Sequence, residues 1–82
     1  MYAIARKGEL GEGYFLEKVS ESISVVLVFT SISLAESYIN EKIAEEYKQY
    51  LAIEDFSFNK FVKFSENINL NSTIRIYIDV RT

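Results

Sequence analysis

Apolar and polar residues alternate or cluster in several separate segments of the chain. Residues 2–6 and 14–19 carry short alternating patterns that are typical of strands, and a glycine-rich stretch at residues 7–13 lies between them. Glycine adopts positive φ at little steric cost, so this stretch predicts a hairpin connection. Residues 25–29 form an uninterrupted, mostly β-branched apolar run, which indicates a central strand covered on both faces.

The middle of the chain carries the clearest helical pattern. Apolar residues recur at steps of three and four from Leu34 to Tyr50, which predicts one amphipathic helix of about four turns. Ser33 and Glu36 fit a capping box, in which the serine accepts from a free amide and the glutamate reaches back to the cap. Ser31 is an equally suitable N-cap.

The last third of the chain predicts a strand, a helix and a final strand. Residues 51–54 fit a short strand, and Asp55 or Ser57 can cap a second helix that runs to about Glu66. The same residues also fit a strand, and we favour the helix. Residues 73–80 alternate strictly, with isoleucine or valine at every second position, which indicates a half-buried strand.

The element order is therefore strand, strand, strand, helix, strand, helix, strand. It predicts an α+β fold in a single domain over residues 1–82, with a four- or five-stranded mixed or antiparallel sheet and two helices packed on one face. Helices on one face leave the other face uncovered. We expect Val26 and Val28 of the central run and Arg75 and Tyr77 of the last strand on that uncovered face.

Composition narrows the chemistry available to the chain. It has 82 residues, and a core of this size supplies only about 3–5 kcal/mol of stability. The sequence contains no cysteine and no histidine, which rules out disulfides, thiolate sites and catalytic imidazoles. Self-association is the remaining way to add stability. We therefore expect a non-enzyme without cofactor or metal, and a homodimer.

Charge narrows the range of partners. The formal net charge is −3, so we expect no binding to nucleic acid or to anionic membranes. The chain begins with an alternating pattern rather than a leader, and the cysteine-free composition favours a cytoplasmic protein. Acidic residues are concentrated at residues 36–55, where three glutamates lie on the polar side of the expected helix: Glu41, Glu45 and Glu46.

Two function hypotheses follow from these patterns. The first is a non-catalytic protein-interaction module that self-associates through the uncovered sheet face or an edge strand, with Arg75 and Tyr77 as typical interface residues. The second is an acidic inhibitor or immunity-type protein that binds a basic nuclease or nucleic-acid enzyme through the acidic residues. Salt-sensitive, electrostatically steered association would distinguish the second from the first.

Overall fold

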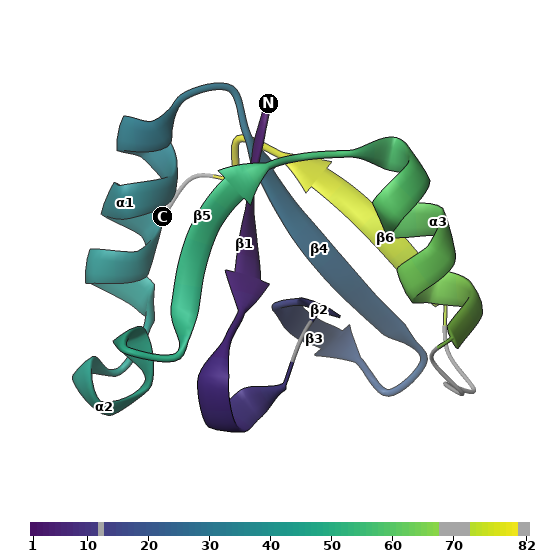
Figure 1. Ribbon diagram of the computed structural model, residues 1–82, viewed down its shortest axis with the longest axis horizontal. Helices are drawn as coiled ribbons and strands as arrows, with labels where there is room; N and C mark the ends of the chain where they lie inside the picture. Colours follow the sequence, from purple (N-terminus) through teal and green to yellow (C-terminus); the bar gives the residue numbers. More distant parts are fainter. Residues whose placement is uncertain (12, 68–72, 81–82) are drawn as a thin grey trace.

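The computed structural model describes residues 1–11, 13–67 and 73–80 (Figure 1). The elements, in chain order, are β1 (Tyr2–Arg6), the 3₁₀ turn η1 (Gly8–Leu10), β2 (Gly13–Tyr14), β3 (Leu16–Ser20), β4 (Ile23–Phe29), α1 (Ile32–Lys42), α2 (Glu45–Lys48), β5 (Leu51–Asp55), α3 (Phe58–Asn67) and β6 (Thr73–Ile78). The α+β class with a mixed sheet is confirmed. The described residues form six strands because the strand expected at residues 14–19 is divided at Phe15.

The sheet runs from β5 through β1 and β4 to β6. β1 pairs along its whole length with β5, and β4 pairs along most of its length with β6, which is parallel to it. Between them, β1 and β4 touch only at one end, through Tyr2–Phe29 and Ala3–Val28. Beyond that end β1 and β4 diverge, which leaves a fork between them. β2 and β3 fill this fork, since β2 pairs with β1 and β3 pairs with β4. The glycine-rich stretch is a hairpin connection, as predicted.

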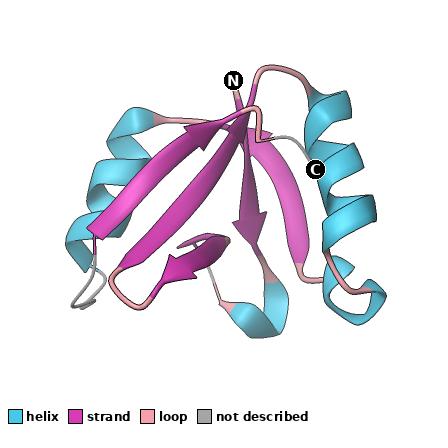
Figure 2. Ribbon diagram, turned by 180° about the vertical axis from the view of Figure 1, so that it is seen from behind, coloured by secondary structure: helices cyan, strands magenta, loops and turns pink. Residues whose placement is uncertain are grey.

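Both faces of this sheet are covered by helices (Figures 1 and 2). Val25, Leu27 and Phe29 point to one face, where they pack against α1. Their neighbours Val26 and Val28 point to the other face, where they pack with aromatic residues of α3. All five side chains are almost completely buried, which confirms the central strand covered on both sides.

The expectation of two helices on one face is therefore wrong. β4, β5 and β6 run in the same direction, and α1 and α3 each connect two of these parallel strands. The connection through α1 runs from β4 across β1 to β5, and the connection through α3 runs in the opposite direction, from β5 to β6. Crossover connections between parallel strands are almost always right-handed. Two right-handed connections that run in opposite directions along a sheet must lie on opposite faces of it. The chain itself therefore covers the sheet face that was expected to be uncovered.

The helix boundaries also differ from the sequence pattern. Ser31 is the N-cap of α1, and its hydroxyl accepts from the Leu34 amide at 3.2 Å. The helix ends at Lys42, because Ile43 takes an extended conformation that carries the chain towards β5. The single long helix expected to reach Tyr50 is instead α1 followed by the short α2.

α3 confirms the helix that we favoured over a strand. The hydroxyl of Ser57 accepts from the Lys60 amide at 3.3 Å, as expected of a cap. The helix is held to the sheet by a cluster of rings, in which Phe64 meets Tyr14 edge-on with 5.4 Å between ring centroids. Phe61 joins the cluster, whereas Phe58 remains 63% exposed. Edge-on aromatic pairs of this kind add to the stabilisation from burial.

Asp79 fixes the end of β6. Its carboxylate accepts from the backbone amide and the hydroxyl of Thr30, both at 2.8 Å. Its φ is +52°, a left-handed conformation that aspartate tolerates better than most residues. The turn directs Val80 onto the core beneath α1, so the free length of β6 ends at Ile78.

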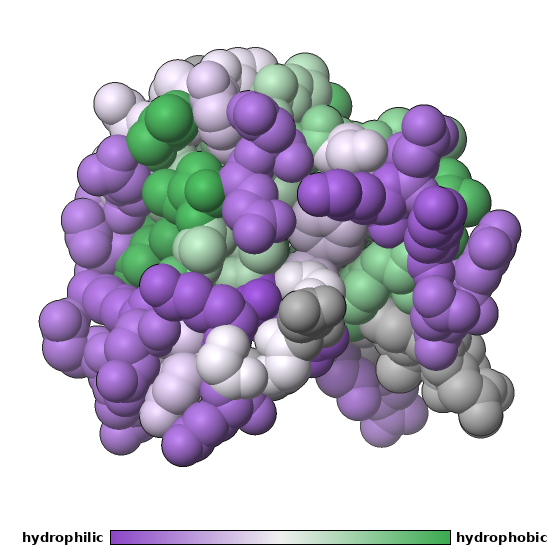
Figure 3. Space-filling view, in the orientation of Figure 1, coloured by the Kyte–Doolittle hydropathy of each residue, from purple (hydrophilic) through white to green (hydrophobic). Residues whose placement is uncertain are grey.

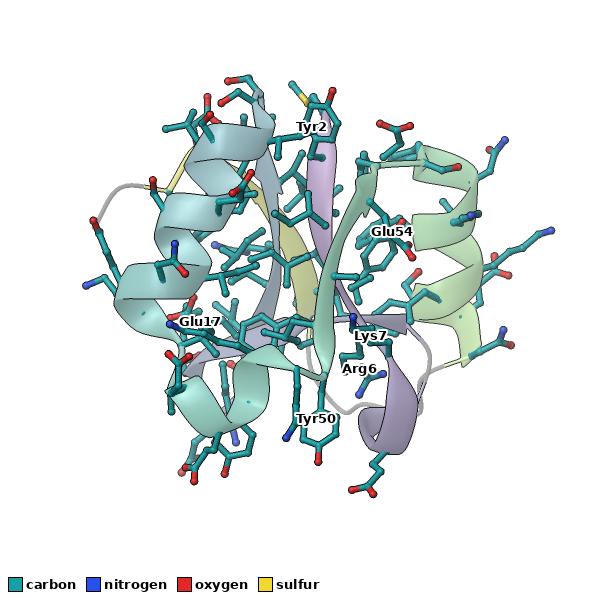
Figure 4. The ribbon with its side chains drawn as sticks, turned by 60° about the vertical axis from the view of Figure 1, so that its left-hand side comes forward. Tyr2, Arg6, Lys7, Glu17, Tyr50 and Glu54 are labelled. Carbon is teal, nitrogen blue, oxygen red and sulfur yellow. The ribbon has the colours of Figure 1, made fainter. Side chains whose placement is uncertain are left out.

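A hydrogen bond ties α1 to β3. The hydroxyl of Tyr38 donates to the Glu17 carboxylate at 2.5 Å (Figure 4 labels Glu17). Burial, and then this bond to Glu17, raises the pKa of Tyr38 well above its ordinary value. Burial also raises the pKa of Tyr14, on the other face of the sheet.

Stability should therefore fall as the pH rises above about 10, the ordinary pKa of tyrosine. In that range the unfolded chain releases protons that Tyr38 and Tyr14 keep in the folded state, so the free energy of unfolding decreases with pH. Urea unfolding at a series of pH values measures this slope. Tyr38→Phe should make the decline shallower, and an identical slope in this variant would contradict the assignment.

Candidate functional site

β6 is an edge strand of the sheet that residues 1–11, 13–67 and 73–80 form. Among the described residues it pairs with β4 alone. The Thr73 amide donates to Ser22 and the Asp79 amide donates to Val28, both at 2.8 Å, so odd-numbered residues turn their backbone groups towards β4. Backbone groups alternate along a strand, so Ile74, Ile76 and Ile78 present their N–H and C=O groups outwards.

The side chains of β6 divide between the two faces. Ile74 and Ile76 are half-buried on the α3 face, whereas Ile78 is 53% exposed. Arg75 and Tyr77 pair with Val25 and Leu27, so they lie on the α1 face, at the margin of the sheet. Both are exposed, and Tyr77 is 38% exposed. The structure thus brings these two expected interface residues together on one accessible surface.

Val26 and Val28 are not part of that surface. Each is 0% exposed, beneath the aromatic residues of α3. They were assigned to an open sheet face, and the second crossover connection buries that face. Their role is to form the core.

The acidic residues of the middle segment are dispersed. Glu41 lies near the end of α1, and Glu45 and Glu46 lie on α2; all three are exposed. Lys48 forms an ion pair with Glu45 at 2.7 Å. Glu54 points to the other side of the sheet, among basic residues. These carboxylates therefore do not form one continuous acidic stripe.

A second surface feature was missed by the sequence reasoning. A hollow of about 460 Å³ lies on the α3 face. Its lining consists of Ala5, Arg6, Lys7, Gly8, Gly13, Tyr14, Glu54, Lys60 and Phe64; we call these residues the basic hollow. Figure 4 shows Glu54 pointing from β5 towards α3, with Arg6 and Lys7 below it at the end of β1. The adjacent pair Arg6-Lys7 just before the first glycine was the available signal, but only the fold brings Lys60 to it.

Within the described residues no group of three or more carboxylates could hold a metal ion, and no helix is long and apolar enough to cross a bilayer. Two surface features can bind a ligand or partner. The edge of β6 can form backbone hydrogen bonds, and the basic hollow carries cationic side chains. Comparison with family models, curated proteins and solved structures found no significant match to this chain.

Proposed function

We propose that this protein is a non-catalytic protein-interaction domain that self-associates through the outer edge of β6. The observation that carries the proposal is the outer edge of β6, which pairs with no other strand of the described chain and ends in the exposed apolar residues Tyr77 and Ile78. An exposed edge strand is a template for another strand. Of the two contacts expected from the sequence, the edge strand remains, because both sheet faces are covered. We also propose the cytoplasmic location that the composition favours.

A two-fold axis through Ile76 would align two copies of β6 along their whole length. Ile76 would then face its own copy, and Ile74 would face the partner's Ile78. These are the residues whose backbone groups point outwards, so each pair can exchange both hydrogen bonds of an antiparallel ladder. The result is one continuous sheet across both subunits, with the isologous contact typical of dimers.

The side chains of this register are complementary on both faces. On the α3 face, the three isoleucines of one strand meet the three of the other. On the α1 face, Arg75 of each subunit lies opposite the partner's Tyr77, so the two arginines do not face each other. A guanidinium beside a tyrosine ring is an attractive cation–π pair. Thr73 lies opposite the partner's Asp79.

The opposite edge of the sheet is a poorer template. The outer side of β5 is shorter and ends in Glu54 and Asp55, and charged residues discourage edge pairing. It also lies beside α1, where apolar residues gather in the space-filling view (Figure 3). Ile39 of α1, Ile43 just after it and Ile53 of β5 pack against the core on this face, which helps to cover this edge. β6, by contrast, contains no acidic residue between Thr73 and Ile78.

Sedimentation equilibrium from micromolar to millimolar protein tests the proposal. We expect a reversible monomer–dimer equilibrium within this range. A monomer at every concentration would overturn it. An oligomer that survives changes in the β6 edge would place the contact elsewhere and would equally overturn it.

Two substitutions at one position provide the matched comparison. Tyr77→Arg would place an arginine opposite the partner's Arg75 in both halves of the dimer, whereas Tyr77→Glu would place a carboxylate there. Cross-strand charge pairs are worth roughly 0.2–1 kcal/mol each, and both pairs change from attraction to repulsion, so the dimer of Tyr77→Arg should dissociate at least about fourfold more readily than that of Tyr77→Glu. Equal dissociation constants would contradict the register.

A further inference from the structure

Arg75 is the one basic residue of β6, and the proposed dimer places two copies of it close together. It is exposed on the α1 face, opposite Val25 of β4. Figure 1 shows α1 beside β5, on the far side of the sheet from β6, so no described helix covers this side chain. Within residues 1–11, 13–67 and 73–80 the guanidinium of Arg75 takes part in no ion pair or hydrogen bond. Its charge is therefore available to a ligand.

The proposed register makes the two copies of Arg75 diagonal neighbours. Arg75 lies opposite the partner's Tyr77, and diagonal residues on paired strands lie about 7–8 Å apart, within reach of long side chains. Odd-numbered residues of β6 turn their backbone groups away from the partner, so this pair exchanges no hydrogen bonds across the interface. At such pairs the right-handed twist of the strands shortens the diagonal between the two residues nearer the strand starts, which here are both Arg75. The other diagonal, to the partner's Asp79, is lengthened.

Two guanidinium groups that converge in this way repel each other unless an anion lies between them. The point between them is on the two-fold axis, so each subunit supplies half of the surroundings. The planar fork of arginine matches the oxygen atoms of phosphate, and two forks can donate paired hydrogen bonds to one tetrahedral anion. An anion with two negative charges neutralises both side chains.

The described carboxylates that lie nearest to Arg75 in the sheet register have partners of their own. Glu17 on β3 is two strands away on the same face, and it accepts from the hydroxyl of Tyr38. Asp79 accepts two hydrogen bonds from Thr30. Neither carboxylate forms an ion pair with Arg75. The neutralising charge must therefore come from a ligand.

We propose that a phosphate dianion binds on the two-fold axis of the dimer, between the two copies of Arg75, and strengthens dimerisation. This inference rests on the proposed function, because a single chain contains only half of the site. A ligand that binds the dimer and not the monomer adds its binding free energy to that of association. One anion per dimer, at ten times its dissociation constant, strengthens association about tenfold.

Sedimentation equilibrium in sodium phosphate and in sodium chloride of equal ionic strength tests the proposal, at about pH 8, where phosphate is a dianion. We expect phosphate to lower the dissociation constant of the dimer about tenfold and the effect to saturate. A dimer with the same dissociation constant in both salts would overturn the anion site and leave the dimer standing. A monomer in both salts would overturn the dimer and the anion site together.

Three variants separate the site from the general effect of phosphate salts, which favour association of many proteins. Arg75→Gln keeps the backbone edge and should still dimerise, but phosphate should change its dissociation constant less than about twofold. Arg75→Lys keeps both charges without the planar forks, so its response should be smaller than that of the parent chain. Lys63→Gln removes an exposed charge on α3 and should keep the full response. A full response in Arg75→Gln would contradict the proposal.

The side-chain Nε–H signal of Arg75 in isotope-labelled protein provides an independent check. Phosphate should shift this signal at protein concentrations at which the dimer forms, and it should shift it little in dilute solution. Glycerol 3-phosphate in the same titration distinguishes free phosphate from an organic phosphate ester, since the true ligand gives the lower midpoint. Equal shifts in dilute and concentrated protein would show that one subunit binds the anion alone, which contradicts a site shared across the axis.

Discussion

Replacing Val26 with aspartate should unfold the domain under conditions in which the parent chain is folded. Val26 is 0% exposed and lies between Leu16 and Ile76 of the neighbouring strands, beneath the aromatic residues of α3. A buried carboxylate without a partner costs several kcal/mol, which equals the roughly 3–5 kcal/mol that a domain of this size has available. Far-UV circular dichroism and urea unfolding measure the effect.

Two further variants make this experiment specific to the α3 face. Val19→Asp places the same carboxylate at a residue that is 48% exposed, and it should leave the domain folded. Val26→Thr keeps the shape of valine but buries a hydroxyl, and it should cost about 1–3 kcal/mol in a chain that still folds. If Val26→Asp were as stable as Val19→Asp, the second face of the sheet would be open after all.

Replacing Gly13 with alanine should cost about 2–4 kcal/mol, the second largest effect that we expect. Gly13 has φ +125°, which L-residues rarely adopt. A β-carbon would also lie 2.6 Å from Cε1 of Phe64, so the ring of Phe64 or the backbone of β2 must shift. The variant should lower the melting temperature and loosen the contact between α3 and the sheet.

Gly11 supplies the control for this substitution. It also has a positive φ, +79°, but an added β-carbon would find no atom within 4 Å. Gly11→Ala therefore carries the backbone strain without the collision, and it should cost only about 1–2 kcal/mol. Equal losses for the two variants would mean that Phe64 does not pack on Gly13.

The local elements could be predicted from the sequence because short-range forces define them. The apolar run at residues 25–29 could only be a strand covered on both sides, and alternation defined β6. Helix α1 was recognisable from its start but not from its end. The apolar period continues through Ile43 to Tyr47, and no glycine or proline interrupts it. The helix stops because β5 must reach its register with β1, where Leu51 lies opposite Arg6, and this requirement comes from the tertiary structure.

The layer arrangement depended on an ordering of strands that periodicity does not contain. Once β5 and β6 are known to lie at opposite edges, the hand of the connections places α1 and α3 on opposite faces. The sequence therefore identified Arg75 and Tyr77 as exposed neighbours, because their positions follow from alternation within one strand. It misplaced Val26 and Val28, because their exposure depends on where α3 packs.

The basic hollow could not be predicted for the same reason. Arg6 and Lys7 are adjacent, but Glu54 and Lys60 come from distant parts of the chain and reach the hollow only through the pairing of β5 with β1 and the packing of α3. Of the three basic lining residues, Lys60 belongs to α3, far from the other two in the sequence.

Amide hydrogen exchange along β6, followed as a function of protein concentration, tests the central claim most directly. In dilute solution the amides of Ile74, Ile76 and Ile78 should exchange quickly, while those of Arg75 and Tyr77, which face β4, stay protected. At millimolar protein the three isoleucine amides should become protected as the second strand pairs with them. Rapid exchange at these three amides at every concentration would show that the edge of β6 binds no second copy.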